Sequence, residues 1–388
     1  MMLKGTYPIE RFQGIATPFY YYDTALLQLT LDKVKEQIKD RRDWQVHYAV
    51  KANHNPVLLR QIAAAGLGAD CVSGGEVQAA LDAGFPPESI VFAGVGKSDK
   101  EILLALEAGI GRFNVESSAE LQVIAQLAAS KGVTARISLR VNPDIGAHTL
   151  AGITTGLAEN KFGIYHGMVD DVIREALDLP SVHFCGLHFH IGSQILEMPD
   201  FAALCNRIND LVARLERQGI QIEDINVGGG LGIEYEHPNH LPIAAFEDYF
   251  NTYKRLLRGS RPVHFELGRS IVAPCGTLVT RVLYVKEGLA RRFAIVDAGM
   301  NDLIRPALYH ARHRIENLSS CGPEMAYDVV GSCCESSDIF GKDIVLEECR
   351  RGDLLAIRSA GAYGESMASQ YNCRPLAPSV FSDEEGRP

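Results

Sequence analysis

The feature that most constrains the fold of this chain is an alternation of short β-type runs with longer helical segments between residues 44 and 269. The helical segments repeat apolar residues at the spacing of an amphipathic helix, whereas the β-type runs are rich in Val, Ile and Phe. Eight β-then-α units in about 225 residues are what a (β/α)8 TIM barrel requires, and a doubly wound sheet is the alternative. The expected strands cover residues 46–50, 69–72, 90–93, 112–115, 135–141, 182–190, 222–227 and 263–267.

Local signals indicate where the helices begin and end. Three serines, Ser73, Ser98 and Ser117, are each followed three residues later by a glutamate, which is the spacing of a capping box. Glycines at 66, 84, 109 and 132 suit helix C-termini. The expected helices cover residues 56–65, 101–108, 119–129, 201–217 and 246–257. The segment 142–163 after the fifth strand is too long for an ordinary connection, so we expect it to serve the function.

The pattern changes after Arg269. Residues 277–286, 292–298, 326–330 and 353–360 are typical of strands separated by Gly, Pro and Asn, which predicts an all-β sandwich or barrel. The first 20 residues lack helical periodicity, and their strand-like end is a candidate to join that domain. We therefore expect an α/β barrel over residues 24–269 and a β-domain formed by residues 1–23 and 270–388.

Composition narrows the class of protein. The net charge of −10 argues against nucleic-acid binding, which needs a basic surface. The N-terminus has no apolar core like that of a signal peptide, and no apolar run reaches membrane-spanning length. Nine scattered cysteines, an odd number, favour reduced thiols. We expect a cytoplasmic protein that binds neither nucleic acid nor a membrane.

Nearly every expected barrel strand ends in a polar or glycine-rich group. In (β/α)8 enzymes the catalytic groups occupy the C-terminal ends of the strands, so this distribution predicts an active site. The residues at these ends are Lys51, Asp70, Asn114, Glu116, Arg140, His188, His190, Gly228, Gly229, Gly230, Glu266 and Arg269.

Each of these groups has an ordinary structural explanation when taken singly. Lys51 could be a surface lysine, but a lysine beside apolar walls can form a Schiff base. The glycine triplet could be a tight turn, or its amides could bind a phosphate. Glu266 could be a satisfied core carboxylate, or it could protonate a pyridine nitrogen. His188 and His190 share one face of a strand, and we expect ring stacking rather than a metal because further ligands are missing at other strand ends. Together these residues predict a pyridoxal phosphate site.

Short motifs between residues 15 and 376 extend the pattern into both domains: YAVKAN at 48–53, ADCVSGGE at 69–76, ENKFG at 159–163, GLHFHIGSQ at 186–194, NVGGG at 226–230, ELGR at 266–269, CESSD at 334–338, GKD at 341–343, GAY at 361–363 and YNCRP at 371–375. With these motifs the chain resembles the fold type III, alanine-racemase-like pyridoxal phosphate-dependent decarboxylases, most of all those that act on diaminopimelate. Leu267, Cys333 and Cys373 depart from the usual residues of that family. Cys333 leaves open which of two adjacent thiols faces the substrate.

The resemblance implies a role for each matching residue. Lys51 would hold pyridoxal 5'-phosphate as a Schiff base, His190 would stack on its ring, and Glu266 would bind the pyridine nitrogen. Asp70 and Tyr363 would line the cofactor. The phosphate would be held by Ser193, Gly228, Gly229, Gly230 and the backbone of Gly268 and Arg269.

The resemblance also implies the substrate and the assembly. Arg269, Arg305, Tyr309, Glu335 and Tyr363 would bind the amino-acid substrate. Cys334 would donate a proton across the interface of a homodimer with shared active sites. The expected reaction converts meso-2,6-diaminopimelate to L-lysine and CO2, the last step of lysine biosynthesis. The alternatives are decarboxylation of another basic amino acid or carboxynorspermidine, a racemase, or an inactive binding homologue.

Overall fold

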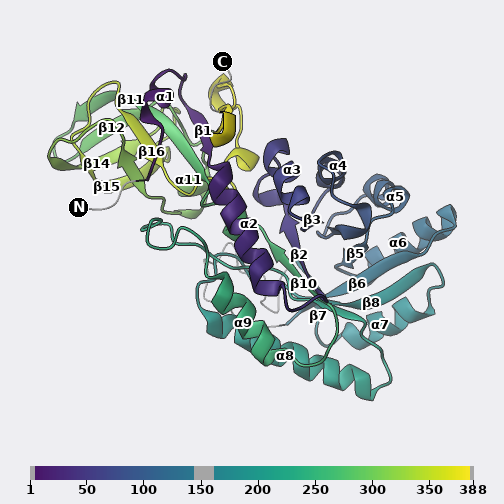
Figure 1. Ribbon diagram of the computed structural model, residues 1–388. Coiled ribbons are helices and arrows are strands. Elements are labelled where there is room, and N and C mark those ends of the chain that lie inside the picture. The colour runs from purple at the N-terminus through teal and green to yellow at the C-terminus, as the bar shows by residue number, and fades with distance from the viewer. Residues whose placement is uncertain (1–4, 144–160, 385–388) are drawn as a thin grey trace. The chain divides into compact units, whose positions relative to one another are not determined.

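The computed structural model describes residues 5–143 and 161–384, which fall into two compact units (Figure 1). Over these described residues, one unit draws on Leu31–Gly232 and Ala245–Gly268, and the other on Met1–Thr30, Ile233–Ala244 and Arg269–Pro388. Residues 24–30 and 233–244, which we expected to belong to the barrel, are grouped with the β-rich unit. Most of the long segment after the fifth barrel strand, residues 144–160, lies outside the described residues.

The first unit is a closed barrel of parallel strands. Its strand order is β5-β4-β3-β2-β10-β9-β8-β6, and β5 pairs with β6 to close the ring. The short β7 (Ile164–Tyr165) extends the sheet from β6. All eight predicted strands are present, and the TIM barrel is confirmed. Their bounds are β2 (Trp44–Ala49), β3 (Gly68–Cys71), β4 (Ile90–Phe92), β5 (Arg112–Val115), β6 (Ala135–Asn142), β8 (Val182–His188), β9 (Asp224–Asn226) and β10 (Val263–Leu267).

Helices follow the strands and pack along the outside of the barrel (Figure 1). Ser73 and Ser117 accept hydrogen bonds from the N–H groups of Glu76 and Glu120, and Ser98 forms a full capping box, as the spacing predicts. The predicted glycines at 66, 84, 109 and 132 all have positive φ angles just beyond helix ends. The helices are α2 (Thr24–Ile38), α3 (Pro56–Ala64), α4 (Gly74–Asp82), α5 (Asp99–Ala108), α6 (Ser118–Lys131), α7 (Val169–Asp178), α8 (Met198–Arg217) and α9 (Phe246–Leu256).

The barrel interior has two polar layers. Arg112 and Asp224, at the N-terminal ends of β5 and β9, form a buried ion pair of 2.5 Å. His47 hydrogen bonds to His264 in the same layer, over 2.9 Å between Nε2 and Nδ1. These groups satisfy one another in the buried interior, as burial of polar groups requires. The side chains near the C-terminal strand ends form the second layer, described below.

The second unit is a mixed β-sheet with short helices. The sheet order is β13-β16-β11-β12-β14-β15, and β1 pairs antiparallel with β11 and parallel with β17. The N-terminal strand therefore joins the β-domain, as expected. The sequence pattern missed β13, β15 and β17. The strands are β1 (Phe19–Tyr22), β11 (Gly276–Glu287), β12 (Arg292–Val296), β13 (Ile315–Asn317), β14 (Glu324–Val330), β15 (Ile339–Glu347), β16 (Leu354–Ile357) and β17 (Ser379–Phe381), and the helices are α1 (Ile9–Gln13), α10 (Arg269–Val272) and α11 (Arg305–Tyr309).

The core of the β-rich unit is aromatic and aliphatic. Phe12 and Tyr21 pack edge to face at 4.9 Å between ring centroids, beside Val279 and Leu354. Burial of such rings is the main stabilising contribution to a small β-domain. Within residues 5–143 and 161–384, no helix is both long enough and apolar enough to cross a membrane.

Candidate active site

Lys51 stands just after β2, in the short 3-10 helix Val50–Ala52. Its ammonium donates a hydrogen bond to Asp70 Oδ2 over 2.9 Å, and the lysine side chain is 39% exposed whereas Asp70 is 1% exposed. Burial and the nearby Glu266 carboxylate raise the pKa of Asp70 to about 6, against the lowering effect of Lys51. Asp70 Oδ1 is buried and has no hydrogen-bond partner among the described residues. The lysine is therefore held by a buried carboxylate, and its side chain remains partly exposed.

Glu266 on β10 is held by three hydrogen-bond donors from three other strands. Oε1 accepts from the side-chain amides of Asn114 and Asn226, over 3.0 Å and 2.7 Å, and Oε2 is 3.1 Å from His188 Nε2. Burial acts to raise the pKa of Glu266, but His188 and then Lys51 outweigh it, so the pKa lies below its usual range. A carboxylate offers about four acceptor positions, so roughly one remains for an N–H donor of a ligand.

His190 lies beyond the end of β8, which stops at His188. The expected strand over residues 182–190 is therefore two residues shorter, and both histidines act electrostatically on Glu266. Burial lowers the pKa of His190 to about 3, with a further contribution from Arg140 and Lys51. Its Nδ1 accepts a hydrogen bond from the Gly229 N–H over 3.3 Å, which leaves the ring proton on Nε2. The imidazole is thus neutral, as suits a ring that stacks on another ring.

The glycine triplet differs from the prediction of three bare amides. The Gly228 N–H donates to Asn226 Oδ1 over 2.9 Å, and the Gly229 N–H donates to His190. Of the three glycines, Gly230 is the one whose N–H has no acceptor among the described residues. A Cβ at position 229 would lie 1.8 Å from the Glu266 carbonyl oxygen. Gly228 has a φ of 69° and Gly230 a φ of 103°, which side chains disfavour. These glycines are therefore required by close packing, and Gly230 is the available donor.

The predicted arginines lie in the β-rich unit and share one partner. Nη1 of Arg269 and Nη1 of Arg305 each donate to the Tyr235 hydroxyl over 2.8 Å. Arg305 also donates to His313 Nε2 over 3.2 Å, and the guanidinium of Arg269 lies 4.8 Å from the centre of the Tyr363 ring. Burial acts to raise the pKa of Tyr235, but the two arginines outweigh it and lower it.

Tyr235 and His313 are functional candidates that the sequence analysis missed. His313 Nδ1 donates to the Arg358 carbonyl over 2.8 Å, so its Nε2 is the acceptor for Arg305. Burial, and then the charge of Arg305, lowers the pKa of His313 to about 3, which keeps the imidazole neutral. Neither residue stands at a strand end or in a recognised motif. Only their contacts with residues distant in the sequence, such as Arg305, identify Tyr235 and His313 as candidates.

Cys333 and Cys334 have different environments. Cys333 is buried, its thiol donates to Asn301 Oδ1 over 3.2 Å, and its N–H donates to Asp338. Cys334 is exposed, and its N–H donates to Asn372 Oδ1 over 3.1 Å. The exposed Glu335 accepts a hydrogen bond from the Tyr371 hydroxyl. Of the two adjacent thiols, Cys334 is therefore the exposed one.

Comparisons with known proteins agree with this geometry. The family described as "Pyridoxal-dependent decarboxylase, pyridoxal binding domain" matches residues 27–273. The chain belongs to this family. A relative named diaminopimelate decarboxylase, from Bacteroides thetaiotaomicron, is 58% identical over 98% of this chain and 100% of its own length. Another relative of that name, from Helicobacter pylori strain J99, is 45% identical over 94% of this chain and 90% of its own.

Solved structures give the same result. The diaminopimelate decarboxylase of Helicobacter pylori in complex with L-lysine superposes with a TM-score of 0.91 at 43% identity, covering 96% of this chain and 93% of that one. The diaminopimelate decarboxylase of M. jannaschii in complex with L-lysine gives 0.89 at 37% identity, covering 96% and 89%. The protein is thus a pyridoxal phosphate-dependent carboxy-lyase.

The barrel residues fit this cofactor. A partly exposed lysine side chain can bind the aldehyde of a phosphorylated pyridine, and an ionised carboxylate with acceptor capacity can bind its ring nitrogen. The neutral imidazole and the buried Asp70 oxygen without a hydrogen-bond partner are compatible with such a ring beside them. Gly268 packs closely against Ala49 and Ala52, which flank Lys51, with about 3.0 Å from a Cβ built there to each of their Cβ atoms. The remaining barrel candidate, Ser193, lies in the loop after β8.

Among the described residues of the β-rich unit, no hydrogen bond or ion pair connects Cys334 or Glu335 with the arginine group. The structure thus divides the predicted β-rich residues into two sets. Arg269 and Arg305 contact Tyr235, the Tyr363 ring contacts Arg269, and Tyr309 acts electrostatically on Arg269. Cys334 and Glu335 form an exposed loop.

Proposed function

We propose that this protein decarboxylates meso-2,6-diaminopimelate to L-lysine and CO2, the last step of lysine biosynthesis. The observation that carries the choice of substrate is Arg305. It is 5% exposed, and in the described structure its hydrogen-bond partners are the Tyr235 hydroxyl and the neutral His313, neither of which is a carboxylate. A buried guanidinium without an anion is costly, so the site favours a ligand that brings a carboxylate. Diaminopimelate has a distal carboxylate, whereas ornithine and lysine do not.

The barrel residues prepare the decarboxylation. Lys51 would bind the cofactor aldehyde covalently and be displaced by the substrate amine. When bound, pyridoxal phosphate accepts the electron pair that remains on the α-carbon as CO2 departs. The ionised Glu266 would keep the pyridine nitrogen protonated, and the neutral His190 would stack on the ring. The Gly230 N–H, Ser193 and the Gly268-Arg269 backbone would hold the phosphate, with Gly228 and Gly229 allowing its approach. Asp70 and Tyr363 would line the cofactor.

The residues of the β-rich unit would bind the distal end of the substrate and return a proton. Arg269 and Arg305, with Tyr309 and Tyr363 beside them, suit bidentate binding of the distal carboxylate. Glu335 suits the distal ammonium. Cys334 would donate the proton that replaces CO2 on the α-carbon, because its thiol is exposed and Cys333 is buried.

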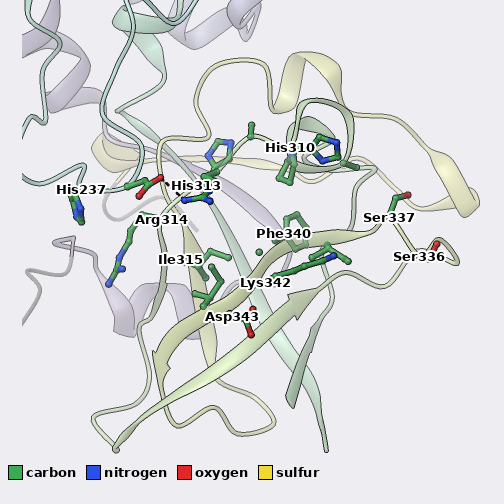
Figure 2. A pocket seen from close by; sticks show the side chains of 18 residues that line it. His237, His310, His313, Arg314, Ile315, Ser336, Ser337, Phe340, Lys342 and Asp343 are labelled. Carbon is green, nitrogen blue, oxygen red and sulfur yellow. Dashed lines mark hydrogen bonds and ion pairs between the residues drawn. The ribbon is translucent and has the colours of Figure 1, made fainter. Parts of the chain in front are cut away.

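A homodimer with shared active sites agrees with the surface of the β-rich unit. The loop from Cys334 to Ser337 is exposed, although it carries the proposed proton donor. Beside it lies a cavity of about 700 Å³, lined by Ser336 and Ser337 of this loop and by Pro306 and Ala307 of α11 (Figure 2). A partner chain seated on this surface would receive Cys334 in its own site. All nine cysteines are free thiols, which agrees with a cytoplasmic location.

A CO2-release assay tests the proposed substrate. We expect kcat/KM for meso-diaminopimelate to exceed that for ornithine, arginine and carboxynorspermidine by about 100-fold or more, since the others leave a buried arginine unpaired. Chromatography should identify the amino-acid product as L-lysine. Faster turnover of any of the other three substrates would overturn the proposal.

Replacing Arg305 by Met tests the distal carboxylate contact. Arg305→Met should lower kcat/KM for diaminopimelate by about 30-fold or more, because one partner of a buried charge pair is lost. Arg312→Met is the matched control, since Arg312 lies in the same unit with a side chain that is 79% exposed. Equal kinetics of the two variants would show that Arg305 does not contact the substrate.

Replacing His188 by Leu tests the support of Glu266. His188 is the largest influence that lowers the pKa of Glu266, so its loss should raise that pKa and let the carboxyl take up a proton more readily. We expect kcat to fall about 10- to 100-fold, the worth of a hydrogen bond to a charged group, and the acid limb of the kcat–pH profile to move to higher pH. His188→Gln, which keeps an N–H donor, should shift that limb less. An unchanged pH profile and cofactor spectrum in His188→Leu would contradict this role.

A further inference from the structure

Three potential metal ligands converge at the N-terminal ends of β8 and β9. The His183 imidazole Nε2 lies 2.8 Å from Glu223 Oε1, and Nε2, the Cys185 Sγ and a Glu223 oxygen all lie within 4.8 Å of one another. His183 and Glu223 have side chains that are 43% and 45% exposed, whereas Cys185 is fully buried. Sulfur is therefore supplied from the protein side, and nitrogen and oxygen are supplied from the solvent side.

The positions of the three side chains are set by strand geometry. His183 and Cys185 are two apart on β8, at a register shift in which Phe184 pairs with Ile137 and Gly186 with Ser138 of β6, and their ligand atoms lie within 4.8 Å of each other. The parallel register places Gly186 opposite Asp224, and the Glu223 N–H donates to the Cys185 carbonyl over 2.8 Å. Glu223 is thus the cross-strand neighbour of Cys185. Asp224 points to the opposite face of the sheet, where it pairs with Arg112.

We propose that His183 Nε2, Cys185 Sγ and a carboxylate oxygen of Glu223 bind one thiophilic divalent cation of the zinc type, with water as the fourth ligand. Imidazole, thiolate and carboxylate are the donors that zinc takes in tetrahedral sites. Zinc bond lengths of about 2.0–2.3 Å put tetrahedral ligand atoms roughly 3.3–3.8 Å apart. Pairs of ligand atoms at the 4.8 Å limit need to close by about 1.0–1.5 Å, and the 2.8 Å pair of His183 Nε2 and Glu223 Oε1 needs to open by roughly 0.5 Å. The thiol releases its proton to solvent as the metal–sulfur bond forms.

The surrounding contacts are compatible with this site. The Cys185 thiol makes a weak contact with the His183 carbonyl, at 3.6 Å, which a metal–sulfur bond replaces. Arg136 Nη2 lies 3.7 Å from Glu223 Oε2, so it can remain on the oxygen that the metal does not use. The hydrogen bond between His183 and Glu223 is half exposed and contributes little to stability by itself. This contact alone does not explain why the buried Cys185 thiol lies next to His183 and Glu223.

The site lies far from the chemistry of the barrel. Five residues separate His183 from His188 along β8, which is about 17 Å of strand. The metal would join β8 to β9, the strands that carry His188 and Asn226 at their other ends. We therefore expect it to stabilise the barrel without entering catalysis. The sequence analysis expected no metal, because it considered only the C-terminal strand ends.

Cobalt(II) is the probe for this site, used on the untagged, cofactor-loaded enzyme. Wild-type protein should bind one Co²⁺ per chain with the intense red-region absorption of a tetrahedral site, away from the cofactor band, and Zn²⁺ should displace it. His183→Gln and Cys185→Ser should lose this absorption, and Glu223→Gln should weaken it. Cys321→Ser is the matched control, because Cys321 is an exposed thiol in the other unit. It should leave the signal intact.

A thermal melt provides the second measurement. Zn²⁺ at a hundredfold excess over its dissociation constant should raise the Tm of wild-type enzyme by several degrees, and the Tm of His183→Gln by less than one degree. His183 is half exposed, so this variant should fold and keep its CO2 release. The proposal fails if wild-type enzyme shows no tetrahedral cobalt spectrum, or if the spectrum persists in Cys185→Ser.

Discussion

Lys51→Ala should lose the visible absorption band of the lysine-bound cofactor and reduce CO2 release from diaminopimelate by about a thousandfold or more. The reason is that Lys51 supplies the only nitrogen that we assign to covalent cofactor binding, and its amine both loads and releases the cofactor. Its side chain is 39% exposed, so the variant should still fold. The loss should therefore appear in activity and absorption, with little change in Tm.

The control is Lys131→Ala, an exposed lysine in the last turn of α6 whose side chain pairs with Glu107. It should keep the absorption band and normal turnover. The Lys51→Ala variant leaves Asp70 buried without its cation, which raises the pKa of Asp70 further. Excess cofactor should bind to this variant non-covalently, without restoring turnover. CO2 release near the wild-type rate from Lys51→Ala would overturn the mechanism.

The barrel could be predicted from sequence because its signals are local. Each strand is a short apolar run, and residues such as Ser73, Ser117 and Gly109 mark helix ends through contacts within a few residues. The β-rich unit was predicted less completely. β15 contains the polar Gly341, Lys342 and Asp343, and it is a strand because it pairs with β14, which no local pattern reveals.

In the candidate active site, too, the local features could be predicted from sequence and the long-range contacts could not. Lys51, Asp70 and Glu266 could be found because they lie at or just after the C-terminal ends of strands, and barrel topology brings these ends together. The contact between Gly228 and Asn226 is local, and an Asn two residues before a glycine is a recognisable turn signal. Gly229 binding to His190 is not local. Two distant arginines meet on Tyr235 for the same kind of reason.

The adjacent cysteines were separated by structure alone. The motif that begins at Cys334 favours this thiol as the proton donor, but Cys333 beside it has the same chemistry and leaves the choice open. The structure gives Cys333 a buried partner, Asn301, and leaves Cys334 on an exposed loop. This exposure presents a problem for a proton donor, since a donor acts best where water is excluded. A second chain that covers the loop would resolve it.

Mixing two inactive variants should restore activity if the sites are shared between chains. Lys51→Ala lacks the cofactor lysine, and Cys334→Ala should lose about 100-fold or more in kcat through loss of its proton donor. When equal amounts are dissociated and reassembled at random, about half of the dimers are mixed, and each has one site free of both lesions. We therefore expect about a quarter of wild-type activity.

The matched control mixes Lys51→Ala with His190→Ala. Both lesions then lie on barrels, so every site of every dimer contains one of them and no activity should return. Differently tagged chains purified over two affinity columns verify that mixed dimers have formed. If such verified dimers of Lys51→Ala and Cys334→Ala stay inactive, Cys334 acts within its own chain or not at all. Activity that returns in the first mixture but not in the control requires that the Cys334 thiol enter the site of the partner chain. One site of each mixed dimer then combines the intact Lys51 of one chain with the intact Cys334 of the other.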